Sequence, residues 1–296
     1  MNGASVLEVA PGVHRLSVPL PSPPHEVAAW VLEGEDGHTL VDTGMDTLPA
    51  RAALRDGAER LGVTPGSLSH VVLTHAHIDH YGLAGPVRAW SGARVAIHAR
   101  EEELARRFVD HWPEDREGVA AAFERMGVPA GVAAELLTVT DRIHALYVPF
   151  QPDQLLTGER GPLPGGAGWE WILTPGHSPG HIVIYHPGQR ILIAGDHVLP
   201  RISPNIGADL YVEDPLSDYL ASLRRLRELP VEAVLPSHGP LFGDLPGRID
   251  QILAHHEERK GKILRFLGTD GPRTAFEVAA NVFGKLPPEH FIHALR

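Results

Sequence analysis

The order of strand-like and helix-like segments predicts an α/β protein in which helices cover sheets built from antiparallel meanders and parallel crossovers. Three observations support this prediction. Strand-like segments open the chain and return in its second half, a long helical stretch separates the two sets, and a helical tail follows. With 296 residues, of which 43% are hydrophobic, the chain can form one large domain or one domain with an appendage.

The first hundred residues are expected to form short strands around one helix. Pro11 and Gly12 indicate a turn between the first two strands, and the polar stretch 33–38 suggests a hairpin. Helical spacing of apolar or small residues predicts a helix over 48–61, with Gly62 closing it. The strands expected here cover 6–9, 14–18, 28–32, 39–41, 71–73 and 94–98.

The middle of the chain is expected to be helical from Glu101 to about Tyr147. Residues 151–168 are rich in Pro and Gly, which is typical of a loop or hairpin. Further strands are expected over 169–173, 182–185, 191–194 and 231–235.

Three more helices are indicated by their start signals and apolar spacing. Asp214 and Pro215 form an N-cap and first helical residue. The buried face of that helix is expected at Leu216, Leu220, Leu223 and Leu226. A helical pattern runs over 245–267, and Thr274–Glu277 match a capping box before a short helix that ends at Gly284.

Composition excludes several kinds of protein. The chain has no cysteine, which rules out a disulfide scaffold, a thiolate zinc site, a cysteine nucleophile and an iron–sulfur cluster. Its net charge of −11 argues against nucleic acid or an anionic membrane as a partner. No signal peptide pattern and no apolar run of roughly 20 residues is visible, so we expect a cytoplasmic protein.

Nineteen histidines could be metal ligands or could be scattered over the surface, and their positions favour ligands. Expected strands run directly into short motifs rich in His and Asp. Because ligands gather at the carboxyl ends of strands in α/β sheets, these motifs predict one convergent site. They are DTG at 42–44, THAHIDH at 74–80, TPGHSPGH at 174–181, GDH at 195–197 and PSHG at 236–239.

The THAHIDH motif has the spacing of a metal site. In an extended segment, His75, His77 and Asp79 project to one face. His80 points the other way unless the chain turns, and Gly82 permits a turn. Imidazole and carboxylate donors of this kind suit zinc, manganese or iron(II), and together with the later motifs they could serve two adjacent cations.

In these motifs the chain resembles the metallo-β-lactamase superfamily. THAHIDH matches the family's H-x-H-x-D-H signature, and His177, Asp196 and His238 follow in the family's order. The resemblance covers roughly residues 5–245 and implies an αββα sandwich as a catalytic domain over 1–245. A helical insertion would cover about 101–150, and a small, winged-helix-like helical appendage would cover 246–296.

The resemblance also implies how the donors divide between two divalent metal ions. His75, His77 and His177 would bind the first metal, Asp79, His80 and His238 the second, and Asp196 would bridge them. Asp42 would lie behind the ligands and orient an imidazole. Zinc is the expected metal, with iron and manganese as alternatives.

The activity implied is metal-dependent hydrolysis, in which a bridging hydroxide attacks an ester, thioester or lactone carbonyl and Asp79 also relays a proton. The chain looks most like the branch that contains glyoxalase II and similar thioesterases and lactonases, which implies a small-molecule substrate. Its DHYGLAG sequence departs from the D-H-x-G-G of glyoxalase II, which puts a glutathione thioester in doubt. Two alternatives remain: a β-lactamase-like endoribonuclease or phosphodiesterase, and a non-catalytic binding protein.

Further expectations concern residues beside the ligands, the insertion and the tail. Asn205 and Tyr211 are candidate substrate contacts, and His181 and His197 are expected to pack beside the ligands. The insertion could form an apolar lid over the substrate or an ordinary helical hairpin with its own core. Its large side chains are Phe108, Trp112, Phe123, Met126 and Tyr147. The tail is expected to be a structural cap or a homodimer surface, with 255–256 solvated.

Overall fold

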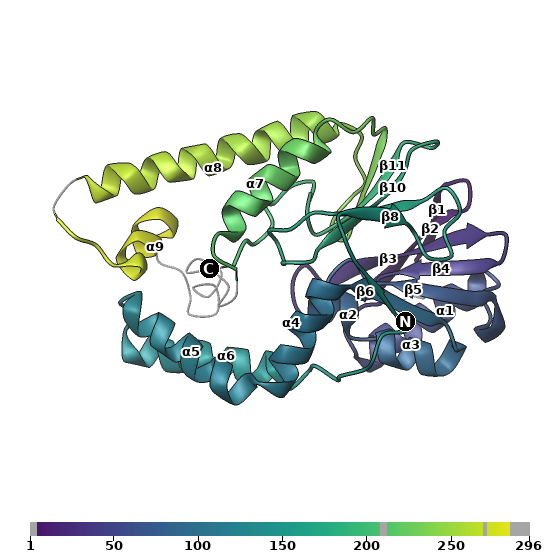
Figure 1. Ribbon diagram of the computed structural model, residues 1–296, viewed down its shortest axis with the longest axis horizontal. Coiled ribbons are helices and arrows are strands. Elements are labelled where there is room, and N and C mark those ends of the chain that lie inside the picture. Colours follow the sequence, from purple (N-terminus) through teal and green to yellow (C-terminus); the bar gives the residue numbers. More distant parts are fainter. Residues whose placement is uncertain (1–4, 208–211, 269–270, 285–296) are drawn as a thin grey trace.

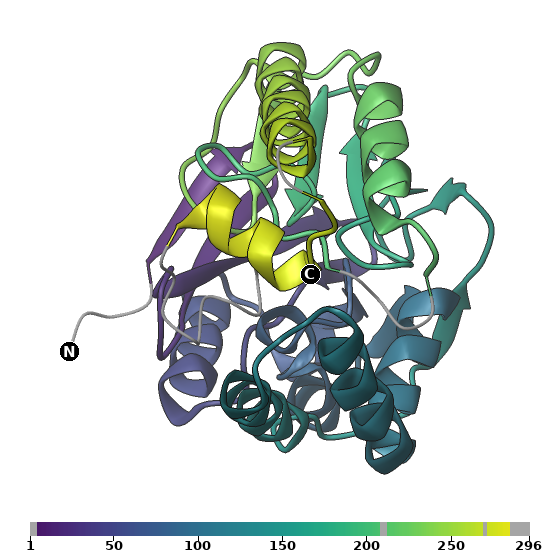
Figure 2. The same ribbon diagram turned by 90° about the vertical axis from the view of Figure 1, so that its left-hand side faces the viewer.

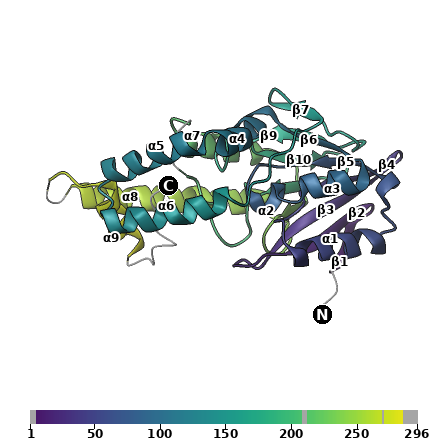
Figure 3. The same cartoon turned by 90° about the horizontal axis from the view of Figure 1, so that it is seen from below.

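Two β-sheets pack face to face and helices cover both outer faces, as the computed structural model shows for residues 5–207, 212–268 and 271–284 (Figure 1). Seen from below, α1 (Leu48–Arg60) and α3 (Ala84–Ser91) lie across the outer face of the first sheet (Figure 3). On the opposite side α7 (Pro215–Leu226) and α8 (Leu245–Leu267) cover the second sheet. This is the αββα sandwich expected from the resemblance.

The first sheet has its strands in chain order, antiparallel in its first half and parallel in its second. The change occurs after β4, where α1 and the short 3-10 turn Pro65–Ser67 cross over to β5. The strands are β1 (Val6–Ala10), β2 (Val13–Pro19), β3 (Glu26–Gly34), β4 (Gly37–Val41), β5 (Leu68–Val72), β6 (Arg94–His98) and β7 (Gln154–Leu156).

The second sheet is antiparallel except for one parallel pair, β11 with β12, which α7 connects. Its order in space is β12 (Ala233–Pro236), β11 (Ile191–Gly195), β10 (Ile182–His186), β9 (Glu170–Leu173) and β8 (Arg160–Pro162). The stretch 151–168 therefore does not form one hairpin. Its two strands, β7 and β8, belong to different sheets.

Alternating side chains on the strands build the layers. In β3, Ala28, Trp30 and Leu32 point into the space between the sheets, whereas the residues between them face α1 and α3. In β10, Ile182 and Ile184 face the first sheet and the intervening residues face α7 and α8. Each central strand is thus buried on both faces, which explains its nearly continuous apolar sequence.

The helical insertion leaves the sandwich after β6 and extends well away from it (Figure 1). It contains α4 (Ala99–Asp110), α5 (Trp112–Arg125) and α6 (Ala130–His144). Its far end meets α9 (Ala275–Phe283), which follows α8, so insertion and tail touch at a distance from the sheets (Figure 1). Seen from that end of the molecule, α9 lies above the helices of the insertion (Figure 2). A separate small core joins them, made of Phe123, Val128, Leu136, Leu137 and Ala279.

The predicted helix ends are confirmed. The Asp214 side chain accepts a hydrogen bond from the Ser217 N–H, and Thr274 and Glu277 form both halves of a capping box. Gly62 has φ 71°, the left-handed conformation that closes a helix. The predicted burial of Leu216 is wrong: it is 40% exposed, and the buried face of α7 begins one turn later, at Tyr219.

Within the described parts of the chain, no helix combines the length and apolar character needed to cross a membrane.

Candidate metal centre

The THAHIDH motif changes direction at His77, a turn that the sequence did not determine. His75 and His77 follow β5, and His77, in extended conformation, is the N-cap of the short helix α2 (Ile78–Tyr81). Asp79 and His80 therefore leave the line of the first two histidines and reach a second group of donors. Gly82 is needed here for space, because a Cβ atom would lie 2.6 Å from the Ile78 carbonyl oxygen.

Three histidine nitrogens converge at the first group. His77 Nδ1 lies 3.0 Å from His75 Nε2 and 2.9 Å from His177 Nε2. Ligands placed tetrahedrally about 2.0–2.1 Å from a zinc ion are roughly 3.3 Å apart, close to this spacing. The triad joins both sheets, since His75 and His77 follow β5 and His177 follows β9.

Asp79, His80 and His238 form the second group, and Asp196 lies between the two groups. His238 Nε2 is 3.3 Å from Asp79 Oδ2 and 3.5 Å from Asp196 Oδ1. Asp196 Oδ1 is also 3.6 Å from His80 Nε2, whereas Asp196 Oδ2 faces His177 Nε2 at 3.7 Å. One carboxylate thus offers one oxygen to each group, which is the arrangement of a bridging ligand.

Four of the histidines are held by hydrogen bonds on the ring nitrogen that points away from the centre. The Nδ1 atoms of His177 and His238 donate to the carbonyl oxygens of Asn205, at 2.8 Å, and Glu26, at 2.9 Å. His75 Nδ1 is 3.0 Å from Thr74 Oγ1 and His80 Nδ1 is 2.9 Å from Asp42 Oδ2. Such bonds place the proton on Nδ1 and leave Nε2 as a metal ligand.

The electrostatics of the two groups differ. Burial, reinforced by the neighbouring His177, lowers the pKa of His77 to about 3, and burial also lowers the pKa values of His75 and His177. These imidazoles are neutral at pH 7, as metal ligands must be. Burial opposes a charge on His80, but the carboxylates of Asp79, Asp196 and Asp42 outweigh it and raise the pKa of His80. The carboxylates around the second group therefore favour a cation there.

Two buried atoms of the centre lack a hydrogen-bond partner among the described residues: His80 Nε2 and Asp196 Oδ1. Buried polar atoms are rarely left unpaired in proteins, and a cation bound between them would satisfy both. The donor set, nitrogen and oxygen only, suits zinc, iron or manganese. The residues present thus fit the divalent metal ions expected from the sequence.

The other predicted residues lie as follows. Asn205 supports the centre through its backbone carbonyl oxygen, which accepts a hydrogen bond from His177 Nδ1. Tyr211 lies outside the described residues. His181 and His197 are fully buried beside the ligands, and His181 Nε2 accepts the Asp196 N–H at 3.2 Å. The solvated position predicted for His256 is wrong: it is only 9% exposed and its ring packs against Tyr219.

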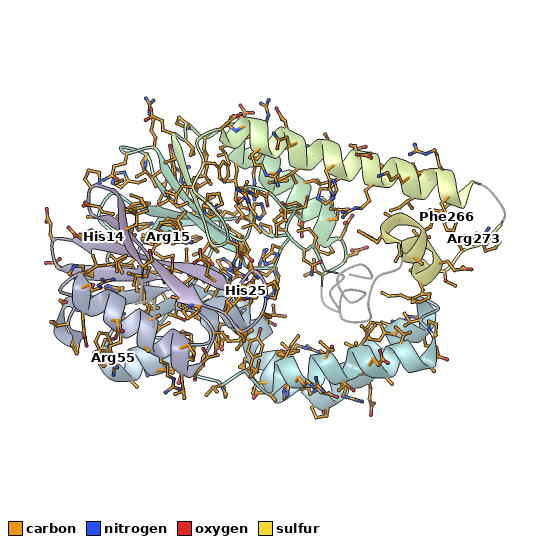
Figure 4. All side chains as sticks on the ribbon, turned by 180° about the vertical axis from the view of Figure 1, so that it is seen from behind. His14, Arg15, His25, Arg55, Phe266 and Arg273 are labelled. Carbon is orange, nitrogen blue, oxygen red and sulfur yellow. The ribbon has the colours of Figure 1, made fainter. Side chains whose placement is uncertain are left out.

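Three residues contribute to the centre in a way that the sequence did not predict, although Tyr147 was expected among the large side chains of the insertion. Glu101 and Tyr147, near the two ends of the insertion, both hydrogen-bond to Ala76. The third, Glu26, contributes a backbone carbonyl oxygen to which His238 donates. The exposed His25 beside it lies at the end of the sandwich that faces the helical insertion and α8 (Figure 4). No motif marks these residues, since an acidic side chain in the first turn of a helix is common for dipole reasons alone.

A sequence-family profile described as "Metallo-beta-lactamase superfamily" matches residues 22–238. The chain therefore belongs to the metallo-β-lactamase superfamily. It is a metallo-hydrolase of that superfamily, with a His/Asp cluster able to bind divalent metal ions.

Individual relatives agree with this assignment. The chain is similar to the probable metallo-hydrolase YqjP of Bacillus subtilis, with 29% identity over 278 residues that cover 90% of this chain and 84% of that protein. A metallo-β-lactamase family protein from Thermus thermophilus shares 33% identity with a TM-score of 0.83, covering 97% of this chain and 92% of that one. A β-lactamase domain protein from Burkholderia ambifaria shares 28% identity with a TM-score of 0.85, covering 98% and 86%.

Proposed function

We propose that this chain is a binuclear metal-dependent hydrolase that cleaves an ester, thioester or lactone. The observation that carries the proposal is the position of Asp196, whose two oxygens face two separate groups of three donors. A single-metal site would need only one of these groups.

Two bound cations would supply a water molecule activated at neutral pH and a Lewis acid that polarises the substrate carbonyl. The neutral His75, His77 and His177 would hold one ion. Asp79, His80 and His238 would hold the other. Asp79 is the most exposed of the carboxylates here, with 23% of its side chain accessible, so it can also pass a proton to solvent or to a leaving group.

A small substrate with an apolar part is favoured by the insertion. Phe108 contacts Trp112 and Tyr147, with ring centroids 5.1 and 4.9 Å apart. The Tyr147 hydroxyl in turn donates to the Ala76 carbonyl oxygen at 2.9 Å, next to the metal ligands. Phe123 is instead used by the separate core at the far end of the insertion. We therefore propose the lid role for the aromatic side chains near Tyr147 only.

The test is a panel of thioesters, lactones, phosphodiesters and single-stranded RNA with metal-loaded protein. We expect turnover of a carbonyl substrate, and the loss of turnover together with metal loading at the first group in the His77→Ala, His177→Ala double variant. The exposed His255→Ala variant is the matched control and should keep both. Cleavage of RNA alone would favour the endoribonuclease alternative, and metal binding without any turnover would favour a binding protein.

A further inference from the structure

Ala76, the residue between the metal-ligand candidates His75 and His77, forms hydrogen bonds with residues at both ends of the helical insertion. Its backbone N–H donates to Glu101 Oε2 at 2.7 Å, and its carbonyl oxygen accepts from the Tyr147 hydroxyl at 2.9 Å. Glu101 is the third residue of α4, at the start of the insertion, and Tyr147 follows α6 at its end. The two ends of the insertion thus meet at one residue, which lies between two metal-ligand candidates.

Glu101 also reaches the loop that carries His177. Its Oε1 accepts the backbone N–H of Gly180 at 2.6 Å, so the two carboxylate oxygens join one loop after β5 to another after β9. Among the described residues, the two loops are also joined by the Ile182 N–H bond to the Thr74 carbonyl oxygen. The Glu101 side chain is fully buried, where a carboxylate is stable only if its oxygens are paired.

The approach of the second loop to α4 depends on a glycine. A Cβ atom on Gly180 would lie 2.9 Å from both the Glu101 backbone nitrogen and the Arg100 Cβ atom. Real Cβ atoms do not approach other atoms so closely, so any larger residue would push the loop away from Glu101. The hydrogen bond between Glu101 and the loop that carries His177 therefore requires a glycine at position 180.

From these contacts we infer that Glu101 and Tyr147 are positioning residues for the first metal group, His75, His77 and His177. His77 and His177 come from different sheets, and their nitrogens must be held about 3 Å apart before an ion arrives. The Glu101 carboxylate sets that spacing across the sheets, and Tyr147 fixes the carbonyl of the peptide that joins Ala76 to His77. This inference rests on the proposed function, because it assumes that these nitrogens bind a metal.

The experiment compares Co²⁺ affinities of full-length Glu101→Gln and Tyr147→Phe with the wild type by chelator competition. The His177→Ala variant identifies which of the two dissociation constants belongs to the first group. A glutamine can accept one N–H but points its own NH₂ at the other, and phenylalanine removes only the hydroxyl. We expect the first constant to weaken about 10- to 100-fold in Glu101→Gln, the range typical when groups that orient ligands are lost.

Tyr147→Phe should weaken the same constant by a smaller factor and leave the second constant unchanged. The matched controls are Glu103→Gln, an exposed acid on the same helix, and Tyr185→Phe, which loses a hydroxyl bond to Pro230 far from the ligands. Gly180→Ala should reproduce the Glu101→Gln effect.

Three results would overturn the inference: equal weakening of both constants, wild-type constants in both variants, or wild-type constants with only a lower melting temperature. If the wild type binds Co²⁺ in these cases, only the inference about Glu101 and Tyr147 fails, and the proposed function is unaffected. If the wild type binds no Co²⁺, the proposed function and this inference both fail.

Discussion

At the scale of single residues, Asp42 decides how His80 is presented. Its side chain is buried at the end of β4 and accepts hydrogen bonds from the Thr74 N–H, the Thr74 hydroxyl and His80 Nδ1. Its φ of 60° is a left-handed conformation that Asp and Asn adopt more readily than most residues. An acidic residue at this place therefore fits both the backbone and the imidazole it orients.

Asp42→Asn should weaken metal binding at the second group by about 10- to 100-fold. Asparagine tolerates the same backbone but presents an NH₂ to His80 Nδ1, which favours the tautomer with its proton on the ligand nitrogen. Metal affinity measured by chelator competition checks this. Asp46→Asn, which breaks a surface ion pair with Arg51, should bind metal like the wild type, and equal behaviour of the two variants would contradict the role given to Asp42.

His256 makes stability depend on pH. Burial, with help from Arg259 and His255, lowers its pKa to about 4 from an ordinary value of 6.5. Below pH 6.5 the unfolded chain takes up a proton that the folded protein refuses, so stability is full above 6.5 and falls as the pH drops towards 4. The slope for one such group is at most about 1.4 kcal/mol per pH unit.

We expect His256→Leu to reduce this pH dependence. Leucine fills similar space, cannot titrate and removes a buried ring nitrogen that has no hydrogen-bond partner in the described structure. Urea unfolding at pH 7, 6, 5 and 4 should show the variant losing less stability than the wild type over that range. Parallel curves would mean that His256 is protonated in the folded protein.

At the scale of elements, the insertion and α9 behave as one packing unit. Leu136 of α6 is fully buried in a core that includes Ala279 of α9, and the Phe276 N–H donates to the Met126 carbonyl oxygen at 3.0 Å. Gly127 has φ 76°, and a Cβ atom there would meet the Thr274 side chain at 2.5 Å. Among the described residues, neither α9 nor the far end of the insertion has another core to join.

Leu136→Ala should destabilise this unit by about 2–5 kcal/mol, the usual cost of such a cavity. Amide hydrogen exchange should speed up together in α5, α6 and α9, while the strands of the sandwich stay protected. Leu146→Ala, which truncates an exposed leucine near the same helices, is the matched control and should change little. Faster exchange in α5 and α6 without α9 would show that the two parts are independent.

At the scale of the whole molecule, the metal centre is where the two halves of the sandwich meet. His75, His77 and His80 follow the first sheet, whereas His177, Asp196 and His238 follow strands of the second. Bound metal ions would therefore link the sheets and stabilise only the folded protein. An ion present at one hundred times its dissociation constant contributes about 2.7 kcal/mol.

Removing metal should lower the melting temperature of the wild type, and adding Zn²⁺ back should restore it. In the His77→Ala, His177→Ala double variant the shift should shrink to what the second group provides. Differential scanning calorimetry with and without chelator measures both. Identical melting temperatures in chelator and in Zn²⁺ would contradict a metal that joins the sheets.

Much of the fold could be predicted because its signals are local. Turn residues, helix caps and alternating apolar residues act over a few positions, and the structure confirms the helix starts at Asp214 and Thr274. The burial of His256 could also have been predicted from the sequence, since it shares a helical face with Ile249 and Ile252. Leu216 shows the limit of such patterns, because periodicity identifies a face but not how far the neighbouring layer extends.

The sequence by itself determined which donors are available, that none is sulfur, and the order in which they follow the strands. Only the tertiary structure decided that Glu101 and Tyr147 close on Ala76, and that α9 completes the core of the insertion. These contacts join segments far apart in the chain, and they form only after the sheets and helices have packed. No periodicity, spacing or cap can encode them, because each is a property of two surfaces rather than of one segment.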